Sequence, residues 1–375
     1  MAPPPTNEAP RPLCTLALSG GIALGAFEAG AYAALDKAGR APDWIAGVSI
    51  GAVNAALIAG NPPERRVERL RQFWFTAAQE PMPFTTFWFG TPLSGPLRRA
   101  ESALGALQAH LLGCPSIFRP RLGIPGAGAA DVSALYDLAP LRTRLTAMVD
   151  FERLNSGSPR ISIAATDILS GDRVTFDTVR GDRIGPDHIL ASGSLLPLFP
   201  PMEVEGRLLG DGGLSGNLPL DLILDDPRQE TLLCFALELF GRHGSRPRSL
   251  STAAARALDI VFGNQSRALL EGRQREHRLR AALRQALPPE VQSTPEIASL
   301  LAQEPSQPAT ILALSYRAAP DEAGAEKPFD FSRTTLTQRW EAGAAAMQQA
   351  LRRLEELPPA EEGLAFHEVP WPAGA

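Results

Sequence analysis

The chain has 375 residues, of which 44% are hydrophobic, and its formal net charge is −5. That length is enough for one large α/β domain, or for one domain with a sizeable insertion. The acidic balance gives no reason to expect a nucleic acid partner. No stretch reaches about 18 uninterrupted apolar residues, so a membrane span is not expected.

The N-terminal segment and the cysteines favour a reducing compartment. Residues 1–12 hold five prolines and no apolar run, so we expect a disordered, proline-rich tail rather than a signal peptide. Cys14, Cys114 and Cys234 are widely spaced, which favours buried thiols and indicates no metal site. We expect a cytoplasmic protein that needs no metal or other cofactor.

A buried strand at 13–18 runs into a glycine-rich segment at 19–25, which is followed by a helix from 26 to about 38. Gly20 and Gly21 would expose backbone N–H groups at the positive end of that helix, where they can hold a negative oxygen. The segment lacks the spacing of a dinucleotide-binding or P-loop motif. We predict an oxyanion hole here; a structural or phosphate-binding turn is the alternative.

A G-x-S-x-G pentapeptide, with Gly47, Ser49 and Gly51, lies between an apolar strand at 44–48 and a helix at 52–59. A strand, a sharp turn and a helix place a serine hydroxyl at an exposed, strained corner, and glycines are needed where that corner is crowded. The pattern predicts Ser49 as a nucleophile. The alternative is a chance match in a glycine-rich chain.

The region from 80 to 130 is interpreted as an insertion. It opens with an aromatic run at 84–89 and continues through a helix-like stretch at 97–112. Such a region can form a lid or an acyl-chain wall beside a hydrolase pocket, or a loop packed on its own small core. A further helix is expected at 133–149, where leucines recur at helical spacing.

Strands alternate with helical patterns along the rest of the chain, and this alternation predicts an α/β fold. The later strands are expected at 160–166, 173–177, 206–210, 231–238 and 310–316. We expect a mostly parallel central sheet with helices on both faces. Residues 13–240 would form the catalytic core, and residues 241–375 a helical part that packs on it and adds the strand near 310–316.

Asp211, followed by Gly212 and Gly213, comes directly after the strand at 206–210, so its carboxylate would project from a strand end. Asp-Gly is also a common plain turn. No histidine stands in a local context typical of a catalytic base. The five are His110, His188, His243, His277 and His367.

Taken together, the glycine loop at 19–25, the elbow at 47–51 and the Asp-Gly-Gly segment at 211–213 resemble the patatin-like phospholipase family. The segment at 191–201 also resembles one that precedes the aspartate in that family. The resemblance implies a three-layer patatin-like fold and a Ser-Asp dyad. On this basis Ser49 is the nucleophile, Asp211 is its base, and Gly20, Gly21 and Ile22 build the oxyanion hole.

The loop departs from the family pattern at two positions. The third glycine is replaced by Ile22, and the usual basic residue is replaced by Leu24. A β-branched side chain tolerates positive φ poorly, so we expect a different backbone path at Ile22. Loss of the cation removes one contact to an anionic head group, which weighs against a phospholipid more than against esterase chemistry.

The helical stretch at 250–287 is basic in its later half, at 265–285. Its arginines are Arg267, Arg273, Arg275, Arg278, Arg280 and Arg284. Such a helix could lie on anionic lipid, which would make the protein peripheral to a membrane. A solvated surface, or contact with an acidic patch of another subunit, is the alternative.

The sequence therefore predicts a serine acyl hydrolase that cleaves fatty-acyl esters of lipids. One rival is an α/β-hydrolase with a Ser-Asp-His triad, in which His243 or His367 is the base. A second rival is a lipid-binding protein that keeps the fold without catalysis.

Overall fold

The computed structural model describes the chain except for residues 1–10, 82–93, 122–133, 228–229, 243–245, 248, 303–307, 320–321, 323, 325, 359–362 and 371–375. Most of the expected tail at 1–12, the aromatic run at 84–89 and His243 lie outside the described residues.

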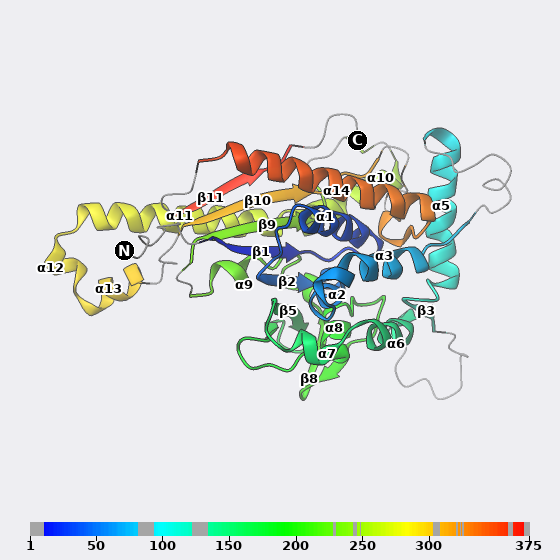
Figure 1. Ribbon diagram of the computed structural model, residues 1–375, viewed down its shortest axis with the longest axis horizontal. Coiled ribbons are helices and arrows are strands. Elements are labelled where there is room, and N and C mark those ends of the chain that lie inside the picture. The colour runs from blue at the N-terminus through cyan, green and yellow to red at the C-terminus, as the bar shows by residue number, and fades with distance from the viewer. Residues whose placement is uncertain are drawn as a thin grey trace, which may run out of the picture.

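A single large sheet forms the centre of the described structure (Figure 1). Its strands are β1 (Leu13–Leu18), β2 (Trp44–Val48), β5 (Arg160–Asp167), β6 (Arg173–Asp177), β7 (Met202–Val204), β8 (Arg207–Asp211), β9 (Leu232–Glu238), β10 (Ala309–Ser315) and β11 (Leu364–Glu368). Two short strands, β3 (Arg119–Pro120) and β4 (Tyr136–Asp137), pair with each other outside it. Each of the seven strands expected from the sequence lies within one residue of an observed strand, whereas β7 and β11 were not expected.

The strand order is β11-β10-β9-β1-β2-β5-β8-β7, with β6 also paired to β5. From β11 to β5 along this order, each strand is parallel to the next. The pairs β5–β6, β5–β8 and β7–β8 are antiparallel. The expected α/β class with a mostly parallel sheet is therefore confirmed. Because parallel strands end at the same edge, the residues that follow β1 and β2 come together there.

Helices cover both faces of the sheet (Figure 1). The helices of the described structure are α1 (Ala26–Lys37), α2 (Ile50–Ala59), α3 (Arg66–Thr76), α5 (Gly95–Leu112), α6 (Ala139–Met148), α7 (Phe151–Leu154), α8 (Pro186–Ser192), α9 (Leu220–Leu224), α10 (Leu250–Gly263), α11 (Gln265–Ala286), α12 (Pro289–Gln292), α13 (Pro295–Ala302) and α14 (Arg333–Glu356). Short 3₁₀ turns are η1 (Ile22–Gly25), η2 (Pro63–Arg65), η3 (Gly212–Leu214) and η4 (Lys327–Phe329). The larger apolar core lies on the face of α1, α2 and α14, and a smaller one lies under α9 and the start of α11.

Helix α1 is fixed by a very close approach to α14. A Cβ added at Gly30 would lie 1.9 Å from the carbonyl oxygen of Trp340, and one added at Gly343 would lie 1.9 Å from that of Phe27. Only glycine permits backbones to pack at that distance. The glycine-rich loop before α1 is therefore held in place by a segment more than 300 residues away.

Two helical expectations need correction. The helix expected at 133–149 begins only at Ala139, because Tyr136 and Asp137 pair with β3 and the Asp137 carboxylate accepts the N–H of Ala139. The helix expected at 250–287 is divided between α10 and α11 at Asn264. The division of the chain at residue 240 stays a prediction, and the sheet crosses it, since β9 precedes that residue and β10 follows it.

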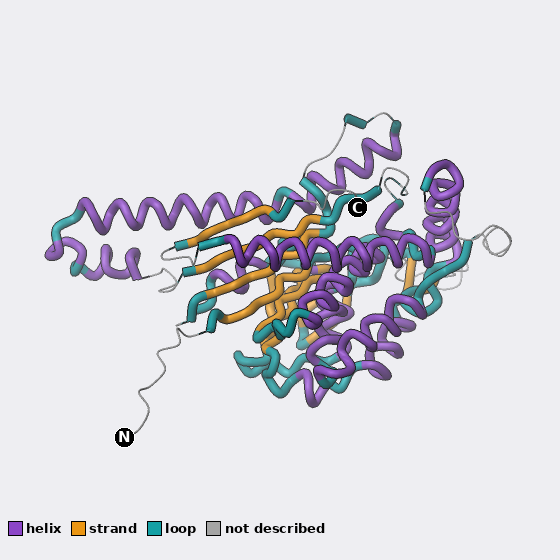
Figure 2. Tube along the Cα trace, turned by 45° about the horizontal axis from the view of Figure 1, so that its top comes forward, coloured by secondary structure: helices purple, strands orange, loops and turns teal. Residues whose placement is uncertain are grey.

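Helix α11 projects from the body of the molecule (Figure 1). Its basic half extends beyond the amino ends of the strands and continues into α12 and α13 (Figures 1 and 2). Arg267, Arg273 and Arg280 form ion pairs with carboxylates. This arm therefore points away from the edge of the sheet that carries Ser49.

Candidate active site

Ser49 occupies a strained corner between β2 and α2. Its φ is 55° and its ψ is −120°, a backbone conformation that residues other than glycine rarely adopt. A Cβ at Gly47 would lie 2.7 Å from the backbone of Gly51, and one at Gly51 would lie 2.4 Å from the carbonyl oxygen of Leu18. The two glycines therefore permit a turn too tight for any side chain at either position.

Ser192 supports the turn at Ser49 through a hydrogen bond to its backbone. The backbone N–H of Ser49 donates to Ser192 Oγ at 2.9 Å, and that hydroxyl donates to the carbonyl of Ala164 at 2.6 Å. A Cβ at the next residue, Gly193, would lie 4.0 Å from Ser49 Oγ. Sequence reasoning noted the segment at 191–201 only as a resemblance, and the structure gives Ser192 a positioning contact to Ser49.

Asp211 lies at the end of β8, with its carboxylate directed to Ser49. The Ser49 hydroxyl interacts favourably with this carboxylate, whose Oδ1 accepts the N–H of Gly213 at 2.7 Å. The side chain is almost completely buried. Burial raises the pKa of this carboxyl from 3.8 to about 6, while the interactions with Ser49 and Gly213 oppose the shift. The carboxylate is thus a stronger base than a solvated aspartate.

The aspartate is followed by glycines for steric reasons. A Cβ at Gly212 would lie 2.3 Å from the carbonyl oxygen of Ala164, and one at Gly213 would lie 2.9 Å from Asp211 Oδ1. Side chains at either position would displace the turn that supplies the Gly213 N–H. The Asp-Gly-Gly segment is therefore more than a plain turn, because its backbone holds the carboxylate in place.

Asn217 organises the glycine-rich loop, and the sequence analysis did not identify it. Its Oδ1 and its backbone oxygen accept the N–H of Gly20 at 3.2 and 3.3 Å, and its Nδ2 donates to the Gly20 carbonyl at 3.2 Å. A Cβ at Gly20 would lie 3.0 Å from Ser49 Cβ. The one signal for Asn217 in the sequence was its amide side chain, six residues after Asp211 and therefore near the predicted site.

The N–H of Gly20 is therefore engaged, which leaves Gly21 and Ile22 as candidate oxyanion donors. Among the described residues, no hydrogen bond uses the N–H of either one. Ile22 adopts a φ of 52°, so the expectation that it would avoid positive φ is wrong. Strain at a β-branched residue persists only where its surroundings impose it, and here it turns the loop beside Ser49.

A buried polar network supports the loop from beneath. Glu28 is buried beneath the loop, and its Oε2 accepts a hydrogen bond from Asn54 Nδ2 at 2.9 Å. Asn54 also donates to the carbonyl of Gly25 at 2.9 Å and accepts the indole N–H of Trp74. Burial raises the pKa of Glu28 well above its usual value, because a charged carboxylate is disfavoured away from water.

Two family models match the chain. One is described as patatin-like phospholipase and matches residues 16–224, more than half of the chain, and the other is described as patatin phospholipase and matches residues 260–362. The chain belongs to the patatin-like phospholipase family. The resemblance drawn from the glycine loop, the elbow and the Asp-Gly-Gly segment is thereby confirmed.

Solved structures of low identity are similar to this family member. VipD from Legionella pneumophila is 14% identical, with a TM-score of 0.42, and the match covers 92% of this chain and 67% of that one. ExoU of Pseudomonas aeruginosa, in its complex with SpcU, is 17% identical, with a TM-score of 0.29 and coverage of 92% and 77%. No curated protein matches the chain.

In this member of the family, the hydrogen-bond partners of the described histidine side chains do not include Ser49 or Asp211. His188 accepts a backbone N–H at the start of α8, and His110 lies on α5. His367 lies on β11, four strands from β2, or roughly 19 Å at the usual strand spacing. His243 and the side chain of His277 lie outside the described residues.

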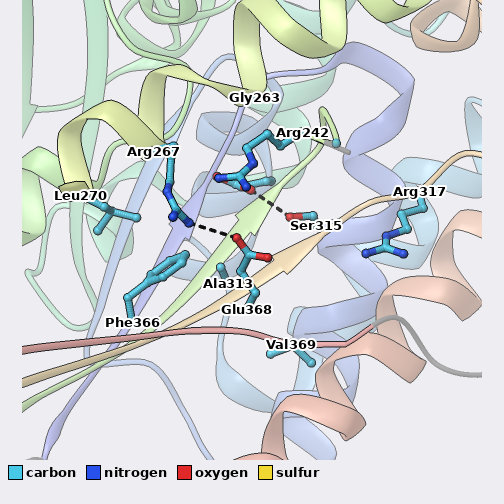
Figure 3. Close-up of a pocket in the computed structure, with 12 residues that line it drawn as sticks. Arg242, Gly263, Arg267, Leu270, Ala313, Ser315, Arg317, Phe366, Glu368 and Val369 are labelled. Atoms are coloured by element: carbon cyan, nitrogen blue, oxygen red, sulfur yellow. Dashed lines mark hydrogen bonds and ion pairs between the residues drawn. The ribbon is translucent and has the colours of Figure 1, made fainter. Parts of the chain in front are cut away.

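A cavity of about 40 Å³ opens at the carboxyl ends of β9, β10 and β11, and Ser49 is not among the residues that line it (Figure 3). Arg267 forms an ion pair with Glu368, and Ser315 donates to Glu238 at 2.9 Å. The ion pair between Arg267 and Glu368 therefore balances one charge of each sign in the cavity wall. Within the described ranges, no three histidine, cysteine, aspartate or glutamate side chains are grouped to hold a metal ion, and no helix is long and apolar enough to cross a membrane.

Proposed function

We propose that the protein is a serine hydrolase that cleaves fatty-acyl ester bonds of lipids through a Ser49–Asp211 dyad. The carrying observation is the favourable interaction of the Ser49 hydroxyl, at a strained elbow, with the buried Asp211 carboxylate, whose pKa is raised to about 6. Membership of the patatin-like phospholipase family supports lipid acyl hydrolysis at the level of the family.

Acylation begins when Ser49 Oγ attacks the ester carbonyl and its proton passes to the Asp211 carboxylate. The carbonyl oxygen becomes negative, and the N–H groups of Gly21 and Ile22 stabilise it, assisted by the positive end of α2 behind the serine. Collapse of the tetrahedral intermediate breaks the ester C–O bond. The departing alkoxide takes the proton from Asp211, which leaves an acyl ester on Ser49.

Deacylation repeats these steps with water as the nucleophile. The Asp211 carboxylate accepts a proton from water, the hydroxide attacks the acyl carbonyl, and Ser49 Oγ leaves and takes the proton back. The free fatty acid departs and the original protonation state returns. A single buried carboxylate serves both halves because its pKa of about 6 lies close to neutral pH.

The two rivals differ in what they require of the site. A Ser-Asp-His triad requires a histidine between nucleophile and acid, whereas here Ser49 itself influences the pKa of Asp211 and no histidine is among the causes of the shift. A non-catalytic relative that merely binds lipid gives no reason to keep a strained serine against a buried carboxylate, since both cost stability.

The proposal is tested with p-nitrophenyl esters of increasing acyl length and with phospholipid, lysophospholipid and neutral lipid. Hydrolysis of at least one acyl ester, without added metal, is expected. A folded protein that hydrolyses none of them would support the lipid-binding rival instead.

The pH dependence of hydrolysis should report Asp211. Only the ionised carboxylate accepts the serine proton, so kcat/KM should rise about tenfold per pH unit at acidic pH and level off above about 6, where the Asp211 pKa lies. A pH–rate profile on a soluble ester measures this. A rise centred at a clearly higher pH that disappears in a histidine variant would point to the triad.

Substitution of Gly21 tests the oxyanion loop. A side chain at Gly21 would meet Leu239 at 2.8 Å, which would move the adjoining N–H groups. Gly21→Val should lower kcat by roughly two to three orders of magnitude, the usual loss for an oxyanion donor. Gly272→Val on α11, where an added Cβ meets nothing within 4 Å, is the matched control. Near-normal kcat in folded Gly21→Val protein would place the oxyanion hole elsewhere.

A further inference from the structure

Helix α5 presents its apolar side to solvent. Leu97, Leu104, Leu107, Leu111 and Leu112 are 61, 43, 51, 65 and 66% exposed. The buried side carries instead the polar or small residues Arg98, Glu101, Ser102, Gly105, Ala106 and Ala109. A surface helix ordinarily shows the opposite arrangement, with its apolar stripe toward the core.

Polar contacts to the start of α14 fix this orientation. Arg98 Nη2 donates to Thr335 Oγ1 at 2.6 Å, and Glu101 accepts a hydrogen bond from Thr334 Oγ1 at 2.9 Å. Both α5 residues are at most 3% exposed, so breaking these bonds would leave buried polar groups without these partners.

A third contact involves Ser102, the residue after Glu101 on α5. Ser102 Oγ donates to Asp330 Oδ2 at 2.5 Å, and a Cβ at Gly105 would lie 2.9 Å from Asp330 Oδ1. The helix therefore cannot rotate its leucines inward without losing this network.

The exposed leucines form one continuous stripe. Leu97, Leu104 and Leu111 repeat every seven residues, and Leu107 lies between the last two, so all four lie on one side of the helix. The acidic residue of α5, Glu101, is on the buried side. The outward face of α5 thus presents leucines without a carboxylate from the helix itself, a composition suited to a lipid surface.

This stripe lies at the catalytic end of the molecule. Helix α5 packs on η4, and η4 packs on η1, the turn that begins at Ile22. Figures 1 and 2 show α5 at the end toward which the parallel strands point, opposite to the arm of α11, α12 and α13. A surface that held α5 would therefore face the side of the molecule on which Ser49 lies.

We propose that the leucine face of α5 docks the protein onto the surface of aggregated lipid. The inference rests on the proposed function, because a hydrolase of lipid esters must draw its substrate from such a surface. Seated there, the stripe buries its leucines among acyl chains, and the sheet edge with the glycine loop and Ser49 is brought toward the lipid.

The test compares two pairs of exposed leucines with the same i, i+4 spacing. Leu107→Gln with Leu111→Gln alters the α5 stripe and keeps a good helix former at both positions. Leu279→Gln with Leu283→Gln makes the same change on α11, where these leucines are 61 and 40% exposed. Thermal unfolding establishes that both variants are folded.

Co-sedimentation with vesicles of phosphatidylcholine, and of phosphatidylcholine with phosphatidylglycerol, gives the first readout. The α5 variant should bind at least about tenfold more weakly than the unaltered protein, and the α11 variant should bind equally. The ratio of the hydrolysis rate on vesicles to that on a monomeric ester should fall in the α5 variant only. Unaltered binding by the folded α5 variant, or no binding by the unaltered protein, would overturn the proposal.

Light scattering separates this proposal from self-association. If the unaltered protein is a dimer that the α5 variant dissociates while vesicle binding persists, the stripe is an interface between two copies and the docking proposal fails. If the protein and its Ser49→Ala variant bind vesicles through α5 but no ester is hydrolysed, docking stands and the proposed hydrolase function fails.

Discussion

Ser49→Ala is expected to lower ester hydrolysis by roughly five to six orders of magnitude, the loss seen when a serine nucleophile is removed from a unit of interacting residues. The substitution deletes the atom that attacks the carbonyl, and nothing else near Asp211 can replace it within the described site. Initial rates on a soluble p-nitrophenyl ester, compared at equal protein concentration, measure the loss.

Ser194→Ala is a matched control for this variant. Ser194 is also buried near the elbow, but its hydroxyl donates to the carbonyl of Leu190 at 2.8 Å rather than to Asp211. Its removal should cost some stability and leave most of the activity. Substantial hydrolysis by folded Ser49→Ala protein would show that another residue is the nucleophile.

Asp211→Asn is expected to be nearly as damaging as Ser49→Ala, because the two residues act as one unit. An amide keeps the shape of the side chain but cannot accept the serine proton. Asp167→Asn is the matched control. That carboxylate ends the neighbouring strand β5 and accepts the N–H groups of Leu169 and Ser170 in a turn, so its loss should leave hydrolysis within about tenfold.

Alanine variants of the histidines complete the comparison. His110→Ala, His188→Ala and His367→Ala should each keep activity within about tenfold, since none of these side chains contacts the pair. His243→Ala and His277→Ala belong in the same series. A fall of several orders of magnitude in any one of the five would establish a triad and contradict the dyad.

The same Asp211→Asn variant should be more stable than the unaltered protein at neutral pH. The folded-state pKa of about 6 exceeds the ordinary 3.8, so the folded protein loses stability as pH rises from about 4 to about 6. The loss totals ~3 kcal/mol from one buried carboxyl. Asparagine does not ionise, so the stability advantage of Asp211→Asn in denaturant unfolding should grow over that interval and then stay constant. An advantage that shrinks across it would contradict the raised pKa.

The sequence was informative where local pattern determines structure. Apolar runs bounded by glycine and proline predicted seven strands, and the elbow at 47–51 depends on steric limits that act within five residues. The approach of Ser49 to Asp211 depends instead on sheet register: β8 runs antiparallel to β5 and pairs Asp211 with Ala165, next to Ala164, the partner of Val48 in β2.

Features set by distant contacts could not be predicted in the same way. Asn217 meets Gly20 only because two loops 197 residues apart close on each other. The φ of Ile22 opposes its own conformational preference, and the surrounding fold imposes it. Such positions are where local reasoning is expected to fail, since function tolerates local strain.

The expected contact with lipid illustrates the same limit. Composition favoured the basic helix at 265–285 as the surface that contacts lipid, but α11 carries these residues away from Ser49. The aromatic run at 84–89 lies outside the described residues. Leucine spacing in α5 is visible in the sequence, yet it reads equally as a core-facing helix. Only the contacts of Arg98 and Ser102 reveal that its leucines face outward.

Fluorophosphonate labelling, mapped by peptide mass spectrometry, tests the dyad most directly. The account predicts a single adduct, on Ser49, whose rate of formation rises with pH through about 6 in step with ionisation of Asp211. Labelling should be lost in Ser49→Ala and nearly lost in Asp211→Asn. An adduct on another serine, or labelling of Ser49 that persists in Asp211→Asn and disappears in a histidine variant, would contradict it.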